Sequence, residues 1–368
     1  MGTLFSVRKK LLSFKDLYRE LYRAKQHYRD NIIFLGMRFL RLYLIDEFSR
    51  NEIFRYGLIS PNLSPDERKA YLSKKKSLRI RNVLNPRSHM QLVEDKVEFY
   101  RYCNRLGIPT PHTYAIVTPA QVITFDGQLL ETASQWESML QDEIKSEFIA
   151  KPAKGVYGRG FDIFRRVDGG FLNTQGMIFS AQDLRIRFAT DCRYDSYILQ
   201  ERIYNHPDIR RFSGTGGLQT VRFNTFITDS GEVDLLFYMM KMISGNNLTD
   251  NFDTGNTGNM IAVGEKTCGQ LLYAFTLDTS GYGMHRIDRH PVSGRTFRDF
   301  EIPYWASARE LVMNLAPKFL PLRTIGWDVA ITENGPKLLE GNIWWDPTNY
   351  APELMCPAQW SILRSSAQ

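Results

Sequence analysis

The chain has 368 residues, of which 43% are hydrophobic, 13% aromatic and 24% charged. This balance excludes an extended disordered chain, and the length suits one large domain or two to three packed domains. The sequence contains neither a long uninterrupted apolar run nor an apolar segment after the basic N-terminus. We therefore expect no membrane span and no secretory leader.

The four cysteines indicate a reducing environment. Cys103, Cys192, Cys268 and Cys356 lie far apart, without a CxxC pair or a histidine at zinc-finger spacing. Neither a disulfide framework nor a zinc site is indicated, so a cytoplasmic location is the simplest expectation.

Most of the excess positive charge lies near the N-terminus. The net charge is +7, and residues 1–50 hold eleven Lys or Arg against five Asp or Glu. Such a surface can attract nucleic acid, anionic lipid or an acidic substrate, although it is most often the solvated side of a helix. We expect no nucleic acid partner, and peripheral contact of residues 1–50 with a membrane stays open.

The N-terminal part of the chain predicts helices. Residues 9–58 have apolar side chains at helical spacing, with basic residues between them. Pro61 and Pro65 end this region, and Ser64 followed by Pro65, Asp66 and Glu67 is typical of a helix N-terminus. A further helix is expected to run to about Lys76.

The remainder mixes helices with strands, which predicts an α+β fold. An amphipathic segment over 93–106 ends at Gly107 and is followed by prolines, so a helix and then a strand are expected there. Residues 146–168 have the pattern strand, glycine-rich loop, strand. Other strands are expected at 196–200, 220–228, 233–242, 326–332 and 337–343, and helices near 181–188 and 306–318.

The segment 324–342 predicts a β-hairpin. Asn334 and Gly335 separate two apolar runs, and both residues accept the positive φ that tight hairpin turns need. With the turn centred on Asn334, Asp328 lies opposite Glu340, and Asn342 follows on the same face. A bulge at Gly335 would shift this register by one residue.

Asp328, Glu340 and Asn342 would then form a metal site. Two carboxylates that face each other across a sheet repel unless a cation lies between them. Oxygen ligands without His or Cys suit Mg²⁺, which keeps water and phosphate oxygens as its other ligands. The alternative is an exposed hairpin whose charges happen to alternate, but the opposite face, with Trp327 and Val329, is apolar.

Lys151 and three glycines, Gly155, Gly158 and Gly160, form a candidate phosphate-binding loop. The residue order fits neither a Walker A motif nor a dinucleotide fingerprint. Glycines let backbone N–H groups approach an anion, and Lys151 offers a charge at the end of a strand. Glycine-rich β-hairpin loops without a ligand are common, so this prediction depends on the rest of the site.

A second nucleotide-binding candidate follows the strand at 196–200. Gln200, Glu201 and the backbone up to Ile203 could face an adenine edge, with Asp208 available for ribose hydroxyls. By themselves these residues are explained more simply by an ordinary strand end and the turn that follows it.

Together these residues resemble the ATP-grasp superfamily, and in particular its sugar-transfer-associated branch, over about residues 90–350. The branch assignment rests on the order and spacing of His206-Pro207-Asp208-Ile209, Thr220-Val221-Arg222, His290-Pro291-Val292-Ser293-Gly294, Ile302-Pro303-Tyr304-Trp305 and Ile325-Gly326-Trp327-Asp328. The resemblance implies two α+β lobes that clasp ATP. It divides the chain into an N-terminal helical region at 1–90, an N-lobe with a glycine-rich lid at 91–203 and a C-lobe with the magnesium site at 204–368.

The resemblance also implies roles for individual residues. It assigns magnesium to Asp328, Glu340 and Asn342, and a phosphate contact to Lys241. It assigns the nucleotide to Lys96, Lys151, Gly155, Gly158, Gly160, Gln200, Glu201, Ile203 and Asp208.

One position departs from the relatives. In the D-alanine ligases an arginine two residues before the first metal aspartate steadies the reacting phosphoryl group, and this chain has Gly326 there. We expect Arg222 or Arg323 to replace it.

The activity that the resemblance implies is an ADP-forming ligase with ATP and Mg²⁺ as cofactors. Such an enzyme makes an acyl phosphate from a carboxylate, and an amine then displaces phosphate, for example to join an amino acid to a saccharide or another small acid. Two alternatives stay open: an ATP-grasp kinase acting on a hydroxyl group, and a nucleotide-binding scaffold with a basic helical arm.

Two further segments are candidates for substrate contact. Residues 244–259 form a long polar loop, and long loops in compact domains tend to be functional or disordered. Basic residues between 285 and 298 could meet an acidic substrate, although turn structure explains His285 and His290 more simply.

Overall fold

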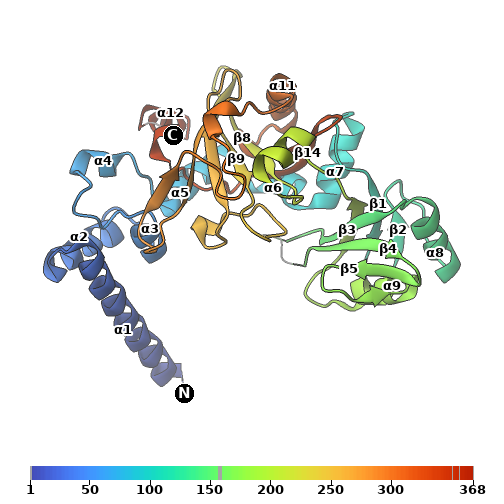
Figure 1. Ribbon diagram of the computed structural model, residues 1–368, viewed down its shortest axis with the longest axis horizontal. Coiled ribbons are helices and arrows are strands. Elements are labelled where there is room, and N and C mark those ends of the chain that lie inside the picture. Colours follow the sequence, from blue (N-terminus) through green and yellow to red (C-terminus); the bar gives the residue numbers. More distant parts are fainter. Residues whose placement is uncertain (1, 156–159, 350, 356, 368) are drawn as a thin grey trace.

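The computed structural model describes residues 2–155, 160–349, 351–355 and 357–367, with side chains from residue 14 onward except 357 and 358. Two antiparallel sheets lie in two lobes (Figure 1). The N-lobe sheet has the order β2-β1-β7-β3-β4-β5-β6 and the C-lobe sheet the order β12-β11-β10-β9-β8-β13-β14. The expected α+β class is confirmed.

The strands of the N-lobe sheet are β1 (Thr113–Val117), β2 (Val122–Thr124), β3 (Glu147–Pro152), β4 (Asp162–Val167), β5 (Gly170–Asn173), β6 (Ile178–Phe179) and β7 (Tyr197–Glu201). Those of the C-lobe sheet are β8 (Thr220–Ile227), β9 (Val233–Met242), β10 (Met260–Gly264), β11 (Leu271–Leu277), β12 (Met284–Ile287), β13 (Thr324–Thr332) and β14 (Gly335–Asn342). Along the chain, the last strand of the N-lobe sheet is β7 and the first strand of the C-lobe sheet is β8.

The N-lobe core lies between its sheet and two helices, α8 (Ala133–Asp142) and α9 (Ala181–Thr190). Trp136 of α8 is fully buried there, and its indole N–H donates to the carbonyl of Ala181 at 2.7 Å. Strand β3 alternates buried and half-buried residues, as expected for a sheet with one face on a core.

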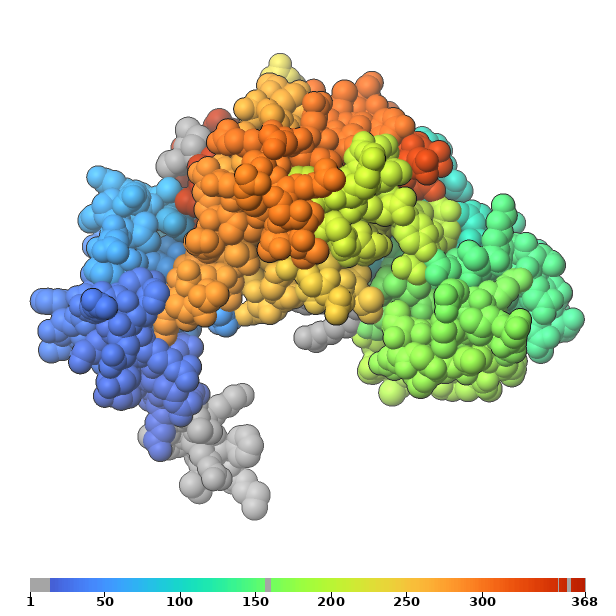
Figure 2. Space-filling view, viewed as in Figure 1, coloured from blue at the N-terminus to red at the C-terminus, as the bar shows by residue number. Residues whose placement is uncertain are grey.

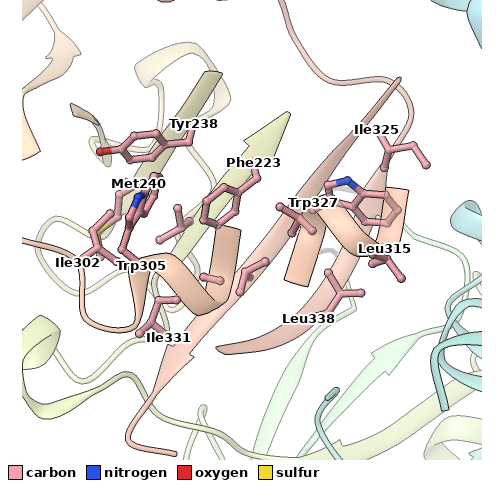
Figure 3. Close-up of a cluster of buried hydrophobic side chains, with 14 of the residues drawn as sticks. Phe223, Tyr238, Met240, Ile302, Trp305, Leu315, Ile325, Trp327, Ile331 and Leu338 are labelled. Carbon is pink, nitrogen blue, oxygen red and sulfur yellow. The ribbon is translucent and has the colours of Figure 1, made fainter. Parts of the chain in front are cut away.

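The C-lobe core packs one sheet face against α11 (Trp305–Leu315), as Figure 3 shows. Phe223, Trp327 and Trp305 meet in this cluster, and the Trp327 indole N–H donates to Thr225 Oγ1 at 2.9 Å. The apolar residues of β13 therefore face the core, which leaves Asp328 and Glu340 on the other side of the hairpin.

Three helices before the first strand belong to the C-lobe. They are α5 (Lys74–Leu84), α6 (Arg87–Glu94) and α7 (Lys96–Arg105), and their buried residues lie in the same hydrophobic clusters as β8, β9 and β13. Asn85 links α5 to β13 by donating to the Thr324 carbonyl at 2.8 Å. The expected domain boundary at 90/91 does not coincide with a break in this packing.

The first helices form a separate small cluster. They are α1 (Gly2–Tyr28), α2 (Ile32–Leu44) and α3 (Arg50–Arg55). This cluster contacts the β11–β12 turn through Tyr282, and α1 projects away from the rest of the molecule (Figure 1). Within the described residues, no helix has both the length and the hydropathy that a bilayer-spanning segment requires.

The sequence missed or misplaced several short elements. The helix expected from Ser64 to about Lys76 is divided into α4 (Pro65–Lys69) and α5, which has its own N-cap at Ser73. Strands β2, β5, β6 and β10 to β12 were not predicted. The remaining elements are α10 (Pro207–Ser213), α12 (Pro357–Ser365) and the 3-10 helices at Asp253–Gly255, Phe297–Asp299, Ala316–Phe319 and Pro352–Leu354.

Candidate active site

The β13–β14 hairpin places the three proposed metal ligands as its sequence predicts. Asp328 pairs with Glu340, and Gly326 pairs with Asn342. The side-chain nitrogen of Asn342 lies 3.5 Å from Asp328 Oδ2 and 3.4 Å from Glu340 Oε1. The three side chains therefore converge on one face of the hairpin.

A bulge makes this register possible. The turn is one residue shorter than expected, since Thr332 pairs with Gly335, and the pairing shifts between Val329 and Asp328 so that Leu339 becomes the extra residue. The Leu339 carbonyl accepts a hydrogen bond from Tyr100 of α7 at 2.5 Å. Without the bulge, Asp328 would lie opposite Leu339 and the two carboxylates would not face each other.

Asp328 forms ion pairs with two basic side chains, one from β8 and one from β9. Arg222 of β8 donates from Nε to Oδ1 at 2.6 Å and from a terminal nitrogen to Oδ2 at 2.7 Å. Lys241 of β9 lies 2.9 Å from Oδ2 and also pairs with Asp250 at 3.3 Å. Asp328 is only 2% exposed, so these charges compensate each other largely away from water.

The mutual pairing shifts the pKa values in this group. Burial alone would raise the pKa of Asp328, but Arg222 and Lys241 outweigh burial and hold that pKa below its usual range. Burial alone would lower the pKa of Arg222, but Asp328 outweighs burial and raises the pKa of this arginine. The pKa of Lys241 is likewise raised, because Asp250 and Asp328 outweigh the effect of burial. All three groups are charged at neutral pH.

Two more lysines lie within electrostatic range of Glu340. The ammonium group of Lys96, at the start of α7, donates to the Gly155 carbonyl at 3.0 Å. Lys151, at the end of β3, donates to the Tyr100 hydroxyl at 2.8 Å. Burial lowers the pKa of Lys96, and it lowers the pKa of Lys151 to about 8.

Glu340 connects these basic groups. Its negative charge raises the pKa of Lys96, Lys151, Arg222 and Lys241, in each case acting with or against stronger local effects. Four basic side chains from four separate elements therefore lie within electrostatic range of one carboxylate. This arrangement is suited to a polyanion that brings a divalent cation with it.

The glycine-rich loop is only partly described. Gly155 lies beside Lys96, while Gly158 falls outside the described residues. Gly160 has a φ of 75°, and a Cβ there would lie 2.7 Å from the ring of Tyr194. Glycine is thus required where the chain enters β4.

The proposed adenine-binding residues lie where the N-lobe sheet ends. Gln200 is fully buried, and its amide nitrogen donates to Thr113 Oγ1 at 3.1 Å. Glu201 forms an ion pair with Lys337 and accepts from the backbone N–H of His112 at 2.9 Å. Ile203 follows β7 in the connection to α10. The Gln200 amide nitrogen, the Glu201 carboxylate and the Glu201 backbone N–H, which donates to the His112 carbonyl, are thus used within the fold. Gln200 Oε1 is buried without a partner among the described residues.

Two predicted residues are not brought to the cluster by any described contact. Asp208, in the first turn of α10, pairs with Arg211 and lies 3.5 Å from His206 Nδ1. Arg323 lies before β13, five residues away from Asp328 along an extended chain. It pairs there with Asp229 at 2.7 Å and donates to the Ile227 carbonyl at 2.9 Å.

Arg222 rather than Arg323 therefore stands beside Asp328, because β8 pairs with β13 and Arg222 lies opposite Asp328. The glycine at position 326 has its own steric reason. A Cβ at Gly326 would lie 2.7 Å from the buried Asn224 Oδ1 and 3.3 Å from Trp345 Cβ. A large side chain is therefore excluded at this position.

The sequence analysis did not single out Asp250 and Tyr100. Asp250 lies in the polar loop 244–259 and accepts from both the backbone N–H and the hydroxyl of Thr220, at 2.8 and 2.5 Å. Tyr100 connects the bulge to Lys151. No local spacing links these residues to their partners, so only the tertiary structure reveals them.

The polar loop is ordered by its own hydrogen bonds. Asn259 is fully buried and donates to the carbonyls of Thr249 and Asn251, both at 2.8 Å. A cavity of about 220 Å³ lies between Leu248 of this loop and the N-lobe, where Gly160, Asp162 and Arg187 line it. In the space-filling view, the yellow segment near residue 250 borders a concave edge of the molecule (Figure 2).

The basic segment 285–298 begins in strand β12 and passes through turns to the 3-10 helix at Phe297–Asp299. His290 is buried, and its Nδ1 accepts from the backbone N–H of Val292 at 3.3 Å. Arg286 lies 3.7 Å from the centre of the Tyr273 ring. The turn explanation therefore holds for His290 and is wrong for His285, which lies in strand β12.

Lys151 should make stability depend on pH. Because its folded pKa, about 8, is below its ordinary value of about 10.4, the protonated lysine opposes folding. Stability should rise between about pH 8 and 10.4, and Lys151→Met should remove that rise and stabilise the protein by at most roughly 3 kcal/mol at neutral pH. Urea unfolding at several pH values, with exposed Lys145→Met as control, measures this. An unchanged pH profile in Lys151→Met would contradict the assignment.

For the described residues, no three His, Cys, Asp or Glu side chains cluster as a metal site, so the candidate set consists of two carboxylates and one amide. Several solved structures are distantly similar to this chain. A biotin carboxylase–β-γ-ATP complex from Campylobacter jejuni is 12% identical, with a TM-score of 0.45. The alignment covers 77% of this chain and 48% of that chain. D-alanine–D-alanine ligase from Bacillus anthracis is 12% identical, with a TM-score of 0.39. The alignment covers 75% of this chain and 67% of that chain.

The chain spans about half the length of the first solved structures that it matches. No curated protein matches it. A family model described as sugar-transfer-associated ATP-grasp matches residues 75–349. That match covers well over half of the chain, which therefore belongs to the sugar-transfer-associated ATP-grasp family.

Proposed function

We propose that this protein is an ATP- and Mg²⁺-dependent ligase that joins a carboxylate to an amine and forms ADP. The observation that carries this proposal is the group around Glu340: one carboxylate pair, Asp328 and Glu340, with four basic side chains from four separate elements in electrostatic range. Membership in an ATP-grasp family and ligases among the distant structural likenesses agree with it.

The residues present fit magnesium and a nucleotide. Asp328, Glu340 and Asn342 offer only oxygen ligands if the Asn342 amide turns its oxygen toward the cation, and this donor set suits Mg²⁺. Bound there, Mg²⁺ would neutralise charge on the transferring phosphoryl group. Lys96 and Lys151 would hold the nucleotide phosphates. Gln200, Glu201 and Ile203 would lie beside adenine, and Asp208 beside the ribose.

The chain's own side chains would then divide the remaining work. Arg222 and Lys241 already point into the site, where they can stabilise negative charge on the reacting group without reorganising. Exclusion of water by the loop at 155–160 stays an expectation, since residues 156–159 fall outside the described part. The loop 244–259 would contact the carboxylate or amine substrate, such as an amino acid and a saccharide or another small acid.

A trapping experiment tests the reaction class. Candidate carboxylates are incubated with Mg-ATP and hydroxylamine, and both ADP and hydroxamate are measured. A ligase that activates a carboxylate is expected to yield hydroxamate in step with ADP. ADP that requires a hydroxyl compound and appears without hydroxamate would instead identify a kinase, and Mg-ATP binding without turnover on any substrate would favour a scaffold.

Glu340→Gln tests the site itself. The substitution removes the negative charge of Glu340, which is proposed to bind the metal and which interacts with the four basic side chains. ADP formation should therefore fall by about a hundredfold or more. Glu333→Gln, in the exposed turn of the same hairpin, is the matched control and should keep full activity. Full Mg-ATP turnover in Glu340→Gln would refute the site assignment.

A further inference from the structure

Helix α2 is apolar on two opposite sides. Leu35, Phe39 and Leu42 are buried in the N-terminal cluster. The opposite side carries a second apolar stripe at the spacing i, i+4, i+7, i+11, with Ile33 66%, Met37 53%, Leu40 53% and Leu44 67% exposed. Single exposed apolar residues are common, but a continuous stripe along a helix indicates an interaction surface.

Other apolar side chains of α1 and α2 are also exposed. Phe34 and Ile45 on or just after α2 are more than half exposed, and α1 contributes Phe14 at 72% and Tyr18 at 63%. We call the exposed residues Ile33, Phe34, Met37, Leu40, Leu44 and Ile45 the α2 apolar face. No described segment of the chain covers this face, and α1 and α2 lie at the end of the molecule opposite the N-lobe (Figure 1).

The N-terminal segment that carries this face is basic. Residues 1–50 hold eleven basic against five acidic residues, and four of the acidic ones already form ion pairs. These are Asp16, Glu20, Asp30 and Glu47. Arg41 is exposed on α2 itself. The surface therefore combines apolar side chains with uncompensated positive charge.

We propose that α1 and α2 form a peripheral docking surface for an anionic lipid bilayer, with the α2 apolar face inserted at the headgroup boundary. Basic residues gain from the negative lipid surface while the apolar stripe leaves water, which is how interfacial helices bind. A second copy of this chain would bring two positive surfaces together, and a nucleic acid backbone would leave the apolar stripe exposed. An anionic membrane satisfies both features, and this inference does not depend on the proposed function.

Vesicle sedimentation of the full chain tests the proposal. The probes are vesicles of phosphatidylcholine alone and of phosphatidylcholine with phosphatidylglycerol. The protein is expected to sediment with the anionic vesicles and to be released by salt, because screening weakens the lipid attraction. The variant Met37→Glu/Leu40→Glu should bind them at least about tenfold more weakly, since two apolar side chains no longer insert.

A matched variant and a measurement of mass separate the outcomes. Val83→Glu/Ile186→Glu places the same charges on exposed apolar helix residues elsewhere and should bind vesicles like the wild type. Circular dichroism and thermal unfolding show whether both variants are folded. The proposal is overturned if the wild type ignores anionic vesicles, if the α2 variant binds them equally well, or if sedimentation velocity shows instead a dimer that the α2 variant abolishes.

Discussion

Asp328→Asn is expected to reduce Mg-ADP affinity and ADP formation by about a hundredfold or more. The substitution removes one of the two carboxylates proposed to hold the metal, and it removes the anchor that orients Arg222 and Lys241. Titration calorimetry with Mg-ADP measures the binding loss without knowledge of the substrates. Asp234→Asn, at an exposed aspartate on strand β9 of the same sheet, is the control and should bind normally.

The same substitution should also destabilise the protein, by about 3 kcal/mol or more. Removing one partner from a buried ion pair leaves the other charge uncompensated, here Arg222 and in part Lys241, which still has Asp250. Because the folded pKa of Asp328 lies below its unfolded value, its stabilisation is present above about pH 4 and is lost as the pH falls further.

Acid unfolding therefore shows whether the stability lost in Asp328→Asn comes from the ion pair or from packing. The stability difference between wild type and Asp328→Asn should be constant near neutral pH and shrink in acid, as the wild-type carboxylate becomes protonated. A difference that persists unchanged into strong acid would mean that the variant disturbs packing rather than the ion pair.

The hairpin was predictable because its signals are local. Alternating apolar residues on β13 and an Asn-Gly pair near the turn predict the hairpin and its two faces, and the predicted pairing of Asp328 with Glu340 is observed. The turn is nevertheless one residue shorter than expected, and the bulge at Leu339 restores the register. That bulge is supported by Tyr100, which lies far away in the sequence, so its existence could not be read from the hairpin alone.

Other features depend on contacts that sequence spacing does not encode. Arg222 and Arg323 were equal candidates in the sequence, and only the pairing of β8 with β13 places Arg222 beside Asp328. The apolar runs of β10 and β11 are present in the sequence, although no strands were predicted there. Strand β12 was missed because it is an exposed edge strand that carries polar residues, which obscures the apolar pattern. Asp250 was hidden for the same reason, since a polar loop gives no periodicity.

Arg222→Met is the second large effect, expected to lower ADP formation by about a hundredfold while Mg-ADP binding weakens less. Arg222 would act mainly on charge that develops during phosphoryl transfer, whereas Asp328 would hold the bound metal. Arg323→Met is the matched control: it lies in the same sheet region but pairs with Asp229, so it should keep its activity even if it loses stability. Equal losses in both variants would contradict the placement of Arg222.

A double-mutant cycle on stability completes this argument. Asp328→Asn leaves Arg222 buried without its carboxylate, whereas Asp328→Asn with Arg222→Met removes both charges and leaves Lys241 paired with Asp250. The double variant should therefore be more stable than Asp328→Asn alone, with a coupling energy of about 2 kcal/mol or more. Urea unfolding of the four proteins measures it. Additivity within about 0.5 kcal/mol would show that the close contact between these side chains contributes little to folding, and that their juxtaposition serves the reaction alone.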